Sequence, residues 1–182
     1  MRLWSVVLAG LAAVGLGGSG CASAPPAGPA AGARATGADF RAVSVRGLSG
    51  EAAPLSAVLE RRPTLISFWA PWCEPCLREQ PELERLSRAA QACGGAVVGV
   101  AVGEAPAGIG AFVRRNGITF PQFTDEHFEL ADAIGQRRIP ATMVFDGAQR
   151  VVFTGDALDT RATSVLKSLL VARPGAPPCA MP

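Results

Sequence analysis

The sequence predicts an α/β domain in which a mixed sheet is covered by helices on both of its faces. Residues 64–70 ("TLISFWA") and 96–102 ("AVVGVAV") are short, continuous apolar runs, as expected of strands buried on both faces of a sheet. Helical patterns alternate with these strands, and two further strands lie close together before a last helical pattern. Strand and helix repeats that end in a hairpin and a closing helix indicate this mixed architecture.

The folded part is expected to span residues 39–172, and its elements follow from local patterns. Residues 40–47 alternate apolar and polar side chains, as a strand does, and Gly47 and Gly50 mark a turn. The expected helices have apolar side chains at helical spacing, and two of them end at a glycine. The predicted strands are 40–47, 64–70, 96–102, 141–146 and 150–156, the last two joined by the turn "DGAQ". The predicted helices are 54–62, 74–92, 108–117, 127–135 and 160–173.

Composition narrows the classes of function. The chain has 182 residues, of which 49% are apolar, which suits one globular domain with an appendage. Its 17 basic and 15 acidic residues give a net charge of +2 and are mixed along the sequence. No basic stripe is present that could follow a phosphate backbone, so we expect no nucleic-acid partner. We expect the domain to be a monomer.

Residues 1–20 read as an export signal. Arg2 supplies a short positive start, residues 3–16 are almost wholly Leu, Val, Ala and Gly, and small residues 17–20 lead into Cys21. A membrane-spanning helix would need about 20 apolar residues, and this run is shorter and ends in glycines that weaken a helix. We therefore expect an exported protein.

The segment "GGSGCAS" resembles a bacterial lipobox, which implies that Cys21 is lipidated and becomes the new N-terminus. Ser19 and Gly20 fit the lipobox, whereas Gly18 stands where an aliphatic residue is usual. The alternative is ordinary signal cleavage near "CASA", which would leave an exported protein with a spare thiol. Residues 21–38 are nearly all Ala, Pro and Gly and would form a tether of up to roughly 50 Å. The expected location is the periplasmic side of the cell envelope, anchored to a membrane through Cys21.

Two cysteines, Cys73 and Cys76, are separated by two residues directly after the buried run 64–70. A structural zinc site commonly needs four ligands, and Cys93, Cys179 and His127 are scattered far along the chain. We therefore expect no metal. A purely structural disulfide is also disfavoured, because a bridge that closes so short a loop restricts the unfolded chain little. The position of the pair favours redox chemistry.

The predicted helix start assigns different roles to the two cysteines. At the first turn, unpaired backbone N–H groups and the helix dipole favour a thiolate, so Cys73 is the expected nucleophile. Cys76 lies one turn later, should be more buried, and is the expected resolving thiol. Pro75 is tolerated in a first turn, and Glu74 adds negative charge that opposes the thiolate and should make the pair more reducing. No cofactor is expected beyond the redox-active disulfide Cys73–Cys76.

The motif "FWAPWCEPC", with Pro81 five residues after the second cysteine and "RIPAT" at 138–142, resembles the thioredoxin fold. The "WCEPC…E" form, the export signal and the tether together resemble the TlpA/ResA-like branch, membrane-attached thiol-disulfide oxidoreductases associated with cytochrome c maturation. The resemblance covers residues 39–172. It implies an insertion between the CxxC helix and the strand after Pro140. It also implies disulfide-containing client proteins such as apocytochrome c, and a membrane thiol-disulfide donor that restores the dithiol.

The resemblance also implies a client-binding surface around Pro140. It implies a cis peptide bond before Pro140, at which the backbone of Ile139 would pair with an extended client segment. A trans proline that opens a strand is the alternative. Trp72 is expected to cover the surface beside Cys73. Residues 137 and 138, both arginines, could flank the groove or could simply be solvated.

Glu79 matches the acidic residue that ResA-like proteins have three places after the resolving cysteine. One helical turn beyond Cys76, it could exchange protons with that thiol, although a solvated surface glutamate is the competing interpretation. Ser67 stands where thioredoxin has a buried aspartate. Without a carboxylate there, Glu79 is the expected proton acceptor.

Cys93 and Cys179 remain, the latter in a proline-rich tail at residues 173–182. These are the two cysteines left once Cys21 and the CxxC pair have been assigned. In an exported protein an even number of remaining cysteines suggests a disulfide, which would attach the tail to the domain. The alternative is two separate thiols, with Cys93 buried as a small apolar side chain.

Two other functions fit the cysteine motif less well. A peroxiredoxin-like peroxidase generally has its cysteine in a PxxxTxxC setting, which "PWCEPC" does not supply. A copper-delivery module could hold copper(I) with two thiolates, but related carriers resemble a CxxxC spacing with a distant histidine. The CxxC spacing favours a protein-disulfide reductase.

Overall fold

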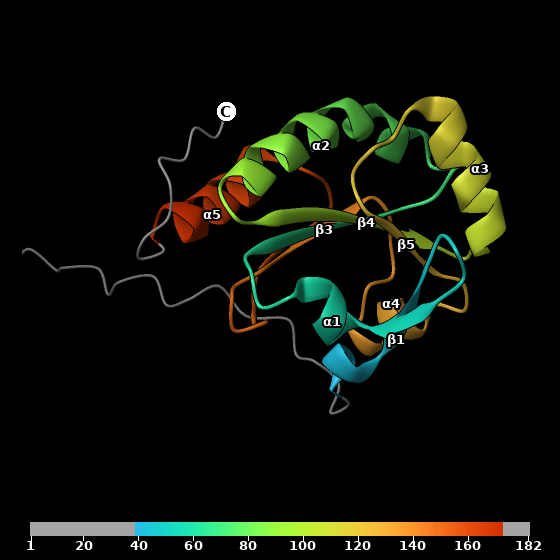
Figure 1. Ribbon diagram of the computed structural model, residues 1–182, viewed down its shortest axis with the longest axis horizontal. Helices are drawn as coiled ribbons and strands as arrows, with labels where there is room; N and C mark the ends of the chain where they lie inside the picture. The colour runs from blue at the N-terminus through green and yellow to red at the C-terminus, as the bar shows by residue number, and fades with distance from the viewer. Residues whose placement is uncertain (1–38, 173–182) are drawn as a thin grey trace, which may run out of the picture. The chain divides into compact units, whose positions relative to one another are not determined.

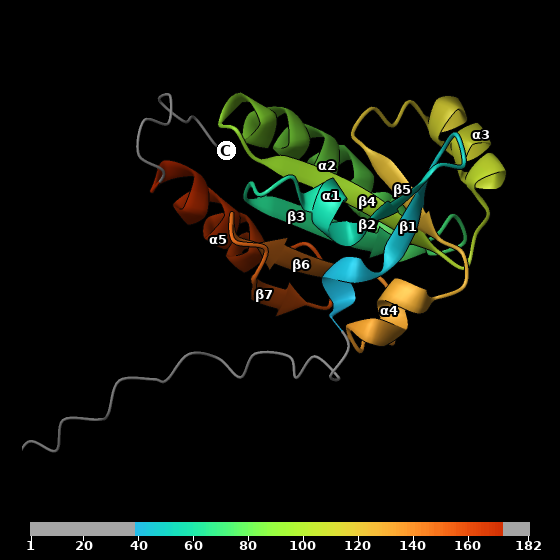
Figure 2. The same ribbon diagram turned by 60° about the horizontal axis from the view of Figure 1, so that its bottom comes forward.

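The computed structural model describes residues 39–172, which form one seven-stranded sheet with the order β2-β1-β5-β4-β3-β6-β7 (Figures 1 and 2). β3 pairs in parallel with β4 and antiparallel with β6, so the sheet is mixed as predicted. The strands are β1 (Ser44–Gly47), β2 (Ala52–Pro54), β3 (Thr64–Trp69), β4 (Ala96–Val102), β5 (Gln122–Asp125), β6 (Ala141–Phe145) and β7 (Val151–Gly155).

Helices cover both faces of this sheet, also as predicted. Three helices lie on one face and two shorter ones on the other (Figure 1). The first face carries α2 (Glu74–Ala92), α3 (Pro106–Asn116) and α5 (Thr160–Val171). The second carries α1 (Leu55–Leu59), α4 (Glu129–Ala133) and a 3-10 turn at Phe40–Ala42.

The central strand β3 explains why two layers of helices are needed. All six of its residues are buried, because the strand has neighbours on both sides and helices above and below. Leu65 and Trp69 belong to the core beneath α2, whereas Ile66 and Phe68 belong to the core on the opposite face. The continuous apolar run of the sequence is therefore an alternation between two cores.

The sequence patterns were less accurate toward the sheet edge formed by β2 and β1. Phe40–Ala42 is a 3-10 turn capped by Asp39, so the strand predicted at residues 40–47 begins only at Ser44. β2 and β5 were not predicted. Three of the four residues of β5 are polar, yet Gln122, Thr124 and Asp125 are buried, which hides the usual strand pattern.

Several predictions fall on residues that the structure does not describe. The export signal, Cys21, the tether and the tail with Cys179 all lie outside residues 39–172. Among the described helices, none has the length and apolar character needed to cross a membrane. The insertion expected between the CxxC helix and Pro140 stays a prediction.

Candidate active site

The two cysteines of the CxxC motif lie at the first turn of α2 and are joined by a disulfide. Cys73 is the N-cap of the helix, with Pro75 in the first turn. The S–S distance is 2.04 Å, and the backbone N–H of Cys76 points to Cys73 Sγ at 3.3 Å. The Cys73 sulfur thus lies at the positive end of a 19-residue helix, where a negative charge is stabilised.

Burial distinguishes this pair from its surroundings. Cys73 is 5% exposed and Cys76 only 1%, whereas Trp72, the residue before them, is 68% exposed. Both sulfurs belong to the core beneath α2. Little of either sulfur is therefore open to a reacting partner, and the exposed neighbour of Cys73 is Trp72.

Glu79 lies on α2 one turn after Cys76 and is half-buried. Its Oε1 accepts a hydrogen bond from the backbone N–H of Leu158 at 3.1 Å, while its buried Oε2 has no partner within the described chain. Burial raises the pKa of Glu79, and the Leu158 N–H partly opposes this shift. These contacts do not fit a solvated surface glutamate.

Glu74, the other acidic residue of the motif, is exposed and forms an ion pair with Arg78 one turn along α2, at 2.7 Å. The guanidinium offsets part of the negative charge beside Cys73, and solvent screens the rest. The effect of Glu74 on the thiolate should therefore be smaller than that of an unpaired carboxylate.

The segment before β6 lies beside the CxxC motif because of the strand register. Phe68, near the end of β3, pairs with Ala141 at the start of β6, so residues 139–140 and the CxxC motif lie at the same edge of the sheet. The Ile139–Pro140 peptide bond is cis, as the resemblance implied. Ile139 is partly buried and packs against both cores, one of which contains the two cysteines.

A pocket of about 400 Å³ opens at this edge, between the start of α2 and the segment before β6. It also borders the end of β4 at Val102 and the residues that follow β5, consistent with the tendency of ligands to bind beyond the carboxyl ends of parallel strands. It is lined by Trp72, Val102, His127, Phe128, Ala131, Asp132, Gln136, Arg137, Arg138 and Ile139. Trp72 and Ile139 were expected near a client groove, the two arginines were expected either at that groove or simply solvated, and His127 had no expected role.

Phe128 is a part of this pocket that sequence reasoning missed. It precedes α4, has a positive φ of 60° and is 45% exposed. A phenylalanine at a helix start carries no sequence signal for a left-handed backbone or for an exposed ring.

Gln80 is a second residue that was missed. It is only 8% exposed, and neither its amide oxygen nor its amide nitrogen has a hydrogen-bond partner within the described chain. The spacing could have revealed it, because Gln80 follows Cys76 by four residues and therefore faces the same side of α2. Ser67, on β3, is buried and pairs in register with Thr142, whose buried hydroxyl is also without a partner in residues 39–172.

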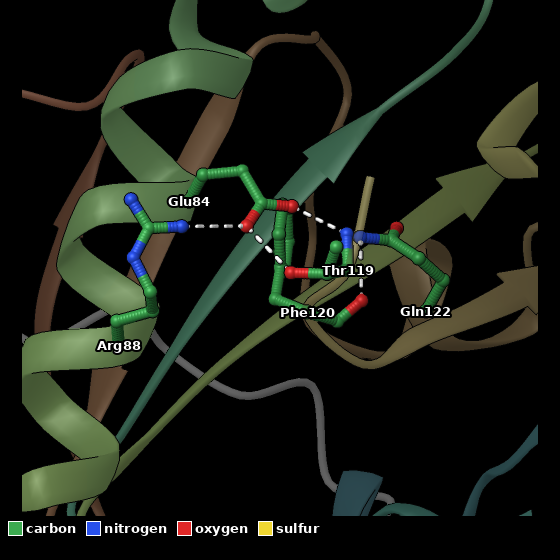
Figure 3. Close-up of polar contacts among 5 residues, drawn as sticks. All are labelled: Glu84, Arg88, Thr119, Phe120 and Gln122. Atoms are coloured by element: carbon green, nitrogen blue, oxygen red, sulfur yellow. Dashed lines mark hydrogen bonds and ion pairs between the residues drawn. The ribbon is translucent and has the colours of Figure 1, made fainter. Parts of the chain in front are cut away.

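Polar contacts fix α2 and Trp69 against the neighbouring strands. Glu84, on α2, accepts hydrogen bonds from the backbone N–H and the hydroxyl of Thr119, as Figure 3 shows. Gln122, three residues further on, donates to the Phe120 carbonyl at 3.3 Å and accepts from Trp69 Nε1 at 3.0 Å. The large buried ring of Trp69, which precedes the CxxC motif, is thereby held in place.

The remaining cysteine of the described chain, Cys93, is buried and forms the C-cap of α2. It is disulfide-bonded, but its expected partner Cys179 lies outside the described residues. Elsewhere within residues 39–172, no group of three or more His, Cys, Asp or Glu side chains is arranged to hold a metal ion.

Comparison with known proteins places these features in a family. The sequence pattern of the AhpC/TSA family matches residues 36–154. Thiol-disulfide oxidoreductase ResA of Geobacillus thermodenitrificans is 34% identical over 92 residues, which is 50% of this chain and 53% of that protein. ResA of Halalkalibacterium halodurans is 31% identical over 105 residues, 58% of this chain and 59% of that protein. The chain thus spans little more than half the length of these curated relatives.

Solved structures show the same fold. A secreted thiol-disulfide isomerase from Corynebacterium glutamicum is 27% identical with a TM-score of 0.60, covering 71% of this chain and 81% of that one. A secreted Mycobacterium tuberculosis disulfide oxidoreductase, described as homologous to E. coli DsbE, is 23% identical with a TM-score of 0.57. That match covers 75% of this chain and 100% of the other. The mixed sheet with helices on both faces is therefore the thioredoxin-like fold that the motifs implied.

Proposed function

Because the chain belongs to the AhpC/TSA family, we propose that it is an exported thiol-disulfide oxidoreductase that reduces disulfides in client proteins. One observation carries the proposal. The Cys73–Cys76 disulfide lies at the N-terminus of α2, with Cys73 as the N-cap beside the exposed Trp72. The similarity to proteins named ResA and to secreted oxidoreductases of the same fold supports this assignment and the export.

The first step is attack by the Cys73 thiolate on a client disulfide. The client S–S bond breaks, a mixed disulfide forms between Cys73 and one client sulfur, and the other client sulfur leaves as a thiolate. The helix N-terminus favours this step, because it stabilises the attacking thiolate without a separate base.

The second step is attack by Cys76 on Cys73 Sγ. Cys76 loses its proton, the Cys73–Cys76 disulfide forms, and the remaining client sulfur leaves as a thiolate, so both electrons end on the client. Glu79 would accept the Cys76 proton. The raised pKa of Glu79 is closer to the pKa of a thiol than that of an ordinary carboxyl group is. This suits Glu79 to exchange a proton with Cys76 during this step.

Client binding would use the pocket edge. Ile139 lies beside the CxxC motif, where its backbone could pair with an extended client segment while Trp72 covers the reacting sulfurs. The cycle closes when a membrane thiol-disulfide donor reduces Cys73–Cys76. Following the TlpA/ResA-like resemblance, we propose apocytochrome c as a client and lipidated Cys21 as the membrane anchor.

Trapping of clients tests the mechanism. In a Cys76→Ala variant the mixed disulfide on Cys73 cannot resolve, so clients should be recovered from cells as disulfide-linked complexes, with none from the matched Cys73→Ala control. Recovery of no linked protein from Cys76→Ala would count against the mechanism, and equal trapping by Cys73→Ala would reverse the two roles. Identification of the trapped proteins by mass spectrometry tests whether apocytochrome c is among them.

Activity assays with the purified domain separate the rival functions. We expect reduction of insulin disulfides in the presence of dithiothreitol. Turnover of peroxide would favour a peroxidase, and tight stoichiometric binding of copper(I) without insulin reduction would favour metal delivery. A Glu79→Gln variant should form the mixed disulfide at the normal rate but resolve it about 10²-fold more slowly.

A further inference from the structure

We propose that the pocket beside Trp72 selects clients: it receives an apolar side chain close to the client cysteine, and Arg138 at its rim binds a carboxylate of the same extended segment. This inference rests on the proposed function. It adds a preference for clients in which a large apolar residue and an acidic residue lie near the reacting cysteine.

The pocket lies beside the reacting cysteine, Cys73. Trp72 is adjacent in sequence to Cys73, and it lines the pocket together with Ile139 from the segment before β6. A client cysteine bonded to Cys73 would therefore lie within one residue of the pocket lining. Extended chain advances about 3.3 Å per residue, so side chains within a few residues of that cysteine reach the pocket.

Exposed aromatic side chains form an apolar wall of the pocket. Four large apolar side chains of the described chain are exposed, and two of them, Trp72 and Phe128, line this one pocket. Single exposed apolar residues are normal, but two aromatic rings that line the same concave site are typical of a binding surface. Such rings are the side chains that most often anchor a partner.

Neighbouring residues hold Phe128 in place. Its backbone N–H donates to the carbonyl of Asp125, whose carboxylate accepts the N–H groups of Leu130 and Ala131 at 3.2 and 2.8 Å. The Phe128 ring lies over Gly103, where a Cβ would come within 2.6 Å of the ring. A left-handed backbone at a phenylalanine is unfavourable, and such strain is concentrated at functional sites. The wall is therefore pre-organised, which lowers the entropic cost of binding.

The rim of the pocket carries a net positive charge. Among the lining residues, Arg137 forms an ion pair with Asp132 at 2.7 Å. Arg138 is exposed and forms no ion pair within residues 39–172, while its carbonyl accepts a hydrogen bond from Gln136. After the Arg137–Asp132 pair is counted as neutral, Arg138 leaves the rim positive. A client carboxylate complements this charge, and a client lysine or arginine opposes it.

Four synthetic peptides test the proposal. Each contains the same internal disulfide, flanked by Leu or Ser on one side and by Glu or Lys further along, in all combinations. The rate of mixed-disulfide formation with the reduced protein is measured by stopped-flow fluorescence at low ionic strength. We expect the Leu and Glu peptide to react about tenfold faster than its Lys counterpart, and about tenfold faster than its Ser counterpart.

Variants assign these preferences to residues. Arg138→Glu should reverse the preference between Glu and Lys peptides, and the matched Arg115→Glu change on α3, outside the pocket, should leave it intact. Phe128→Ser should abolish the preference for Leu over Ser, while Phe128→Leu and the exposed control Val152→Thr should keep it. Because each result is a ratio of rates within one variant, a general loss of reactivity does not imitate it.

The outcomes separate this inference from the proposed function. If the wild-type protein reduces all four peptides at equal rates, the inference is wrong and the oxidoreductase function stands. If Arg138→Glu still prefers the Glu peptide, Arg138 is not the recognition residue and the inference is likewise wrong. If no peptide disulfide reacts with the reduced wild-type protein, the proposed function itself fails.

Discussion

The backbone N–H of Leu158 donates to Oε1 of Glu79 at 3.1 Å, which ties the CxxC helix to the segment before α5. The contact orients the half-buried carboxylate one helical turn after Cys76. The other carboxylate oxygen, Oε2, is buried without a partner in the described chain, and burial raises the pKa of Glu79 although the Leu158 N–H opposes the shift.

A Glu79→Gln variant should alter the pH dependence of stability. Burial raises the pKa of Glu79 in the folded protein above its ordinary value of 4.5, so the folded state binds the proton more tightly than the unfolded state. The stabilisation from protonated Glu79 is present below that value and is lost as the pH rises through the folded pKa. The free energy of unfolding of the wild-type protein should therefore fall relative to that of Glu79→Gln as the pH rises above the ordinary value of 4.5.

Urea unfolding of the oxidised proteins at several pH values measures this difference. Glu74→Gln, which removes an exposed carboxylate from the same helix, serves as the control for the loss of a carboxylate from α2. A difference between wild type and Glu79→Gln that does not vary with pH would contradict the assigned environment of Glu79.

Replacement of Gln80 by Leu should stabilise the fold. The side chain is 8% exposed, and its two polar atoms have no hydrogen-bond partner in residues 39–172. A leucine of similar size would remove that desolvation cost, and we expect the free energy of unfolding to rise by about 1 kcal/mol. Gln80→Ala is the control, since it removes the amide but leaves a cavity. A Gln80→Leu variant less stable than wild type in thermal unfolding would show that the amide is paired in solution.

Replacement of Gln122 by Leu should destabilise the fold by about 1–3 kcal/mol, because the buried indole N–H of Trp69 would lose its acceptor. Denaturant unfolding measures the effect. Trp69→Phe removes the same donor, so the double variant should be less destabilised than the sum of the two single variants. Additive effects would mean that the Trp69–Gln122 hydrogen bond contributes nothing to stability.

The partner of Cys93 is open to direct chemical analysis. Cys93 is buried and disulfide-bonded, and we predict that Cys179 is its partner. Peptide mapping without reductant should recover a linked peptide that contains both cysteines. Because this bond closes a long loop, Cys179→Ser should lower the free energy of unfolding by roughly 4 kcal/mol. Recovery of Cys93 linked to any other cysteine would show the prediction to be wrong.

The sequence was most informative where one local pattern coincides with one element. The helix predicted at residues 74–92 and the strand predicted at 96–102 match α2 and β4, because helical spacing, a first-turn proline and a continuous apolar run each have one good solution. The cis bond before Pro140 was reached through the family resemblance. Nothing in the local pattern required it.

The parts that were missed depend on contacts between distant segments. β5 is buried through its pairing with β4 and β1, and no local signal shows that Gln122 will find Trp69 as a partner. The pocket position of Phe128 depends on a local turn with Asp125 and on Gly103, which only the folded chain brings beneath the ring. Only part of the proposed client-recognition site, Trp72 and Ile139, could therefore be predicted from sequence.

The burial of both sulfurs beneath α2 has a kinetic consequence. With Cys76 1% and Cys73 5% exposed, a thiol that collides elsewhere on the surface cannot reach the disulfide. Exchange then requires a molecule that fits the edge of the pocket and brings its sulfur in line with Cys73. Access to Cys73, more than the reduction potential alone, would determine which thiols in a mixed redox environment exchange electrons with this protein.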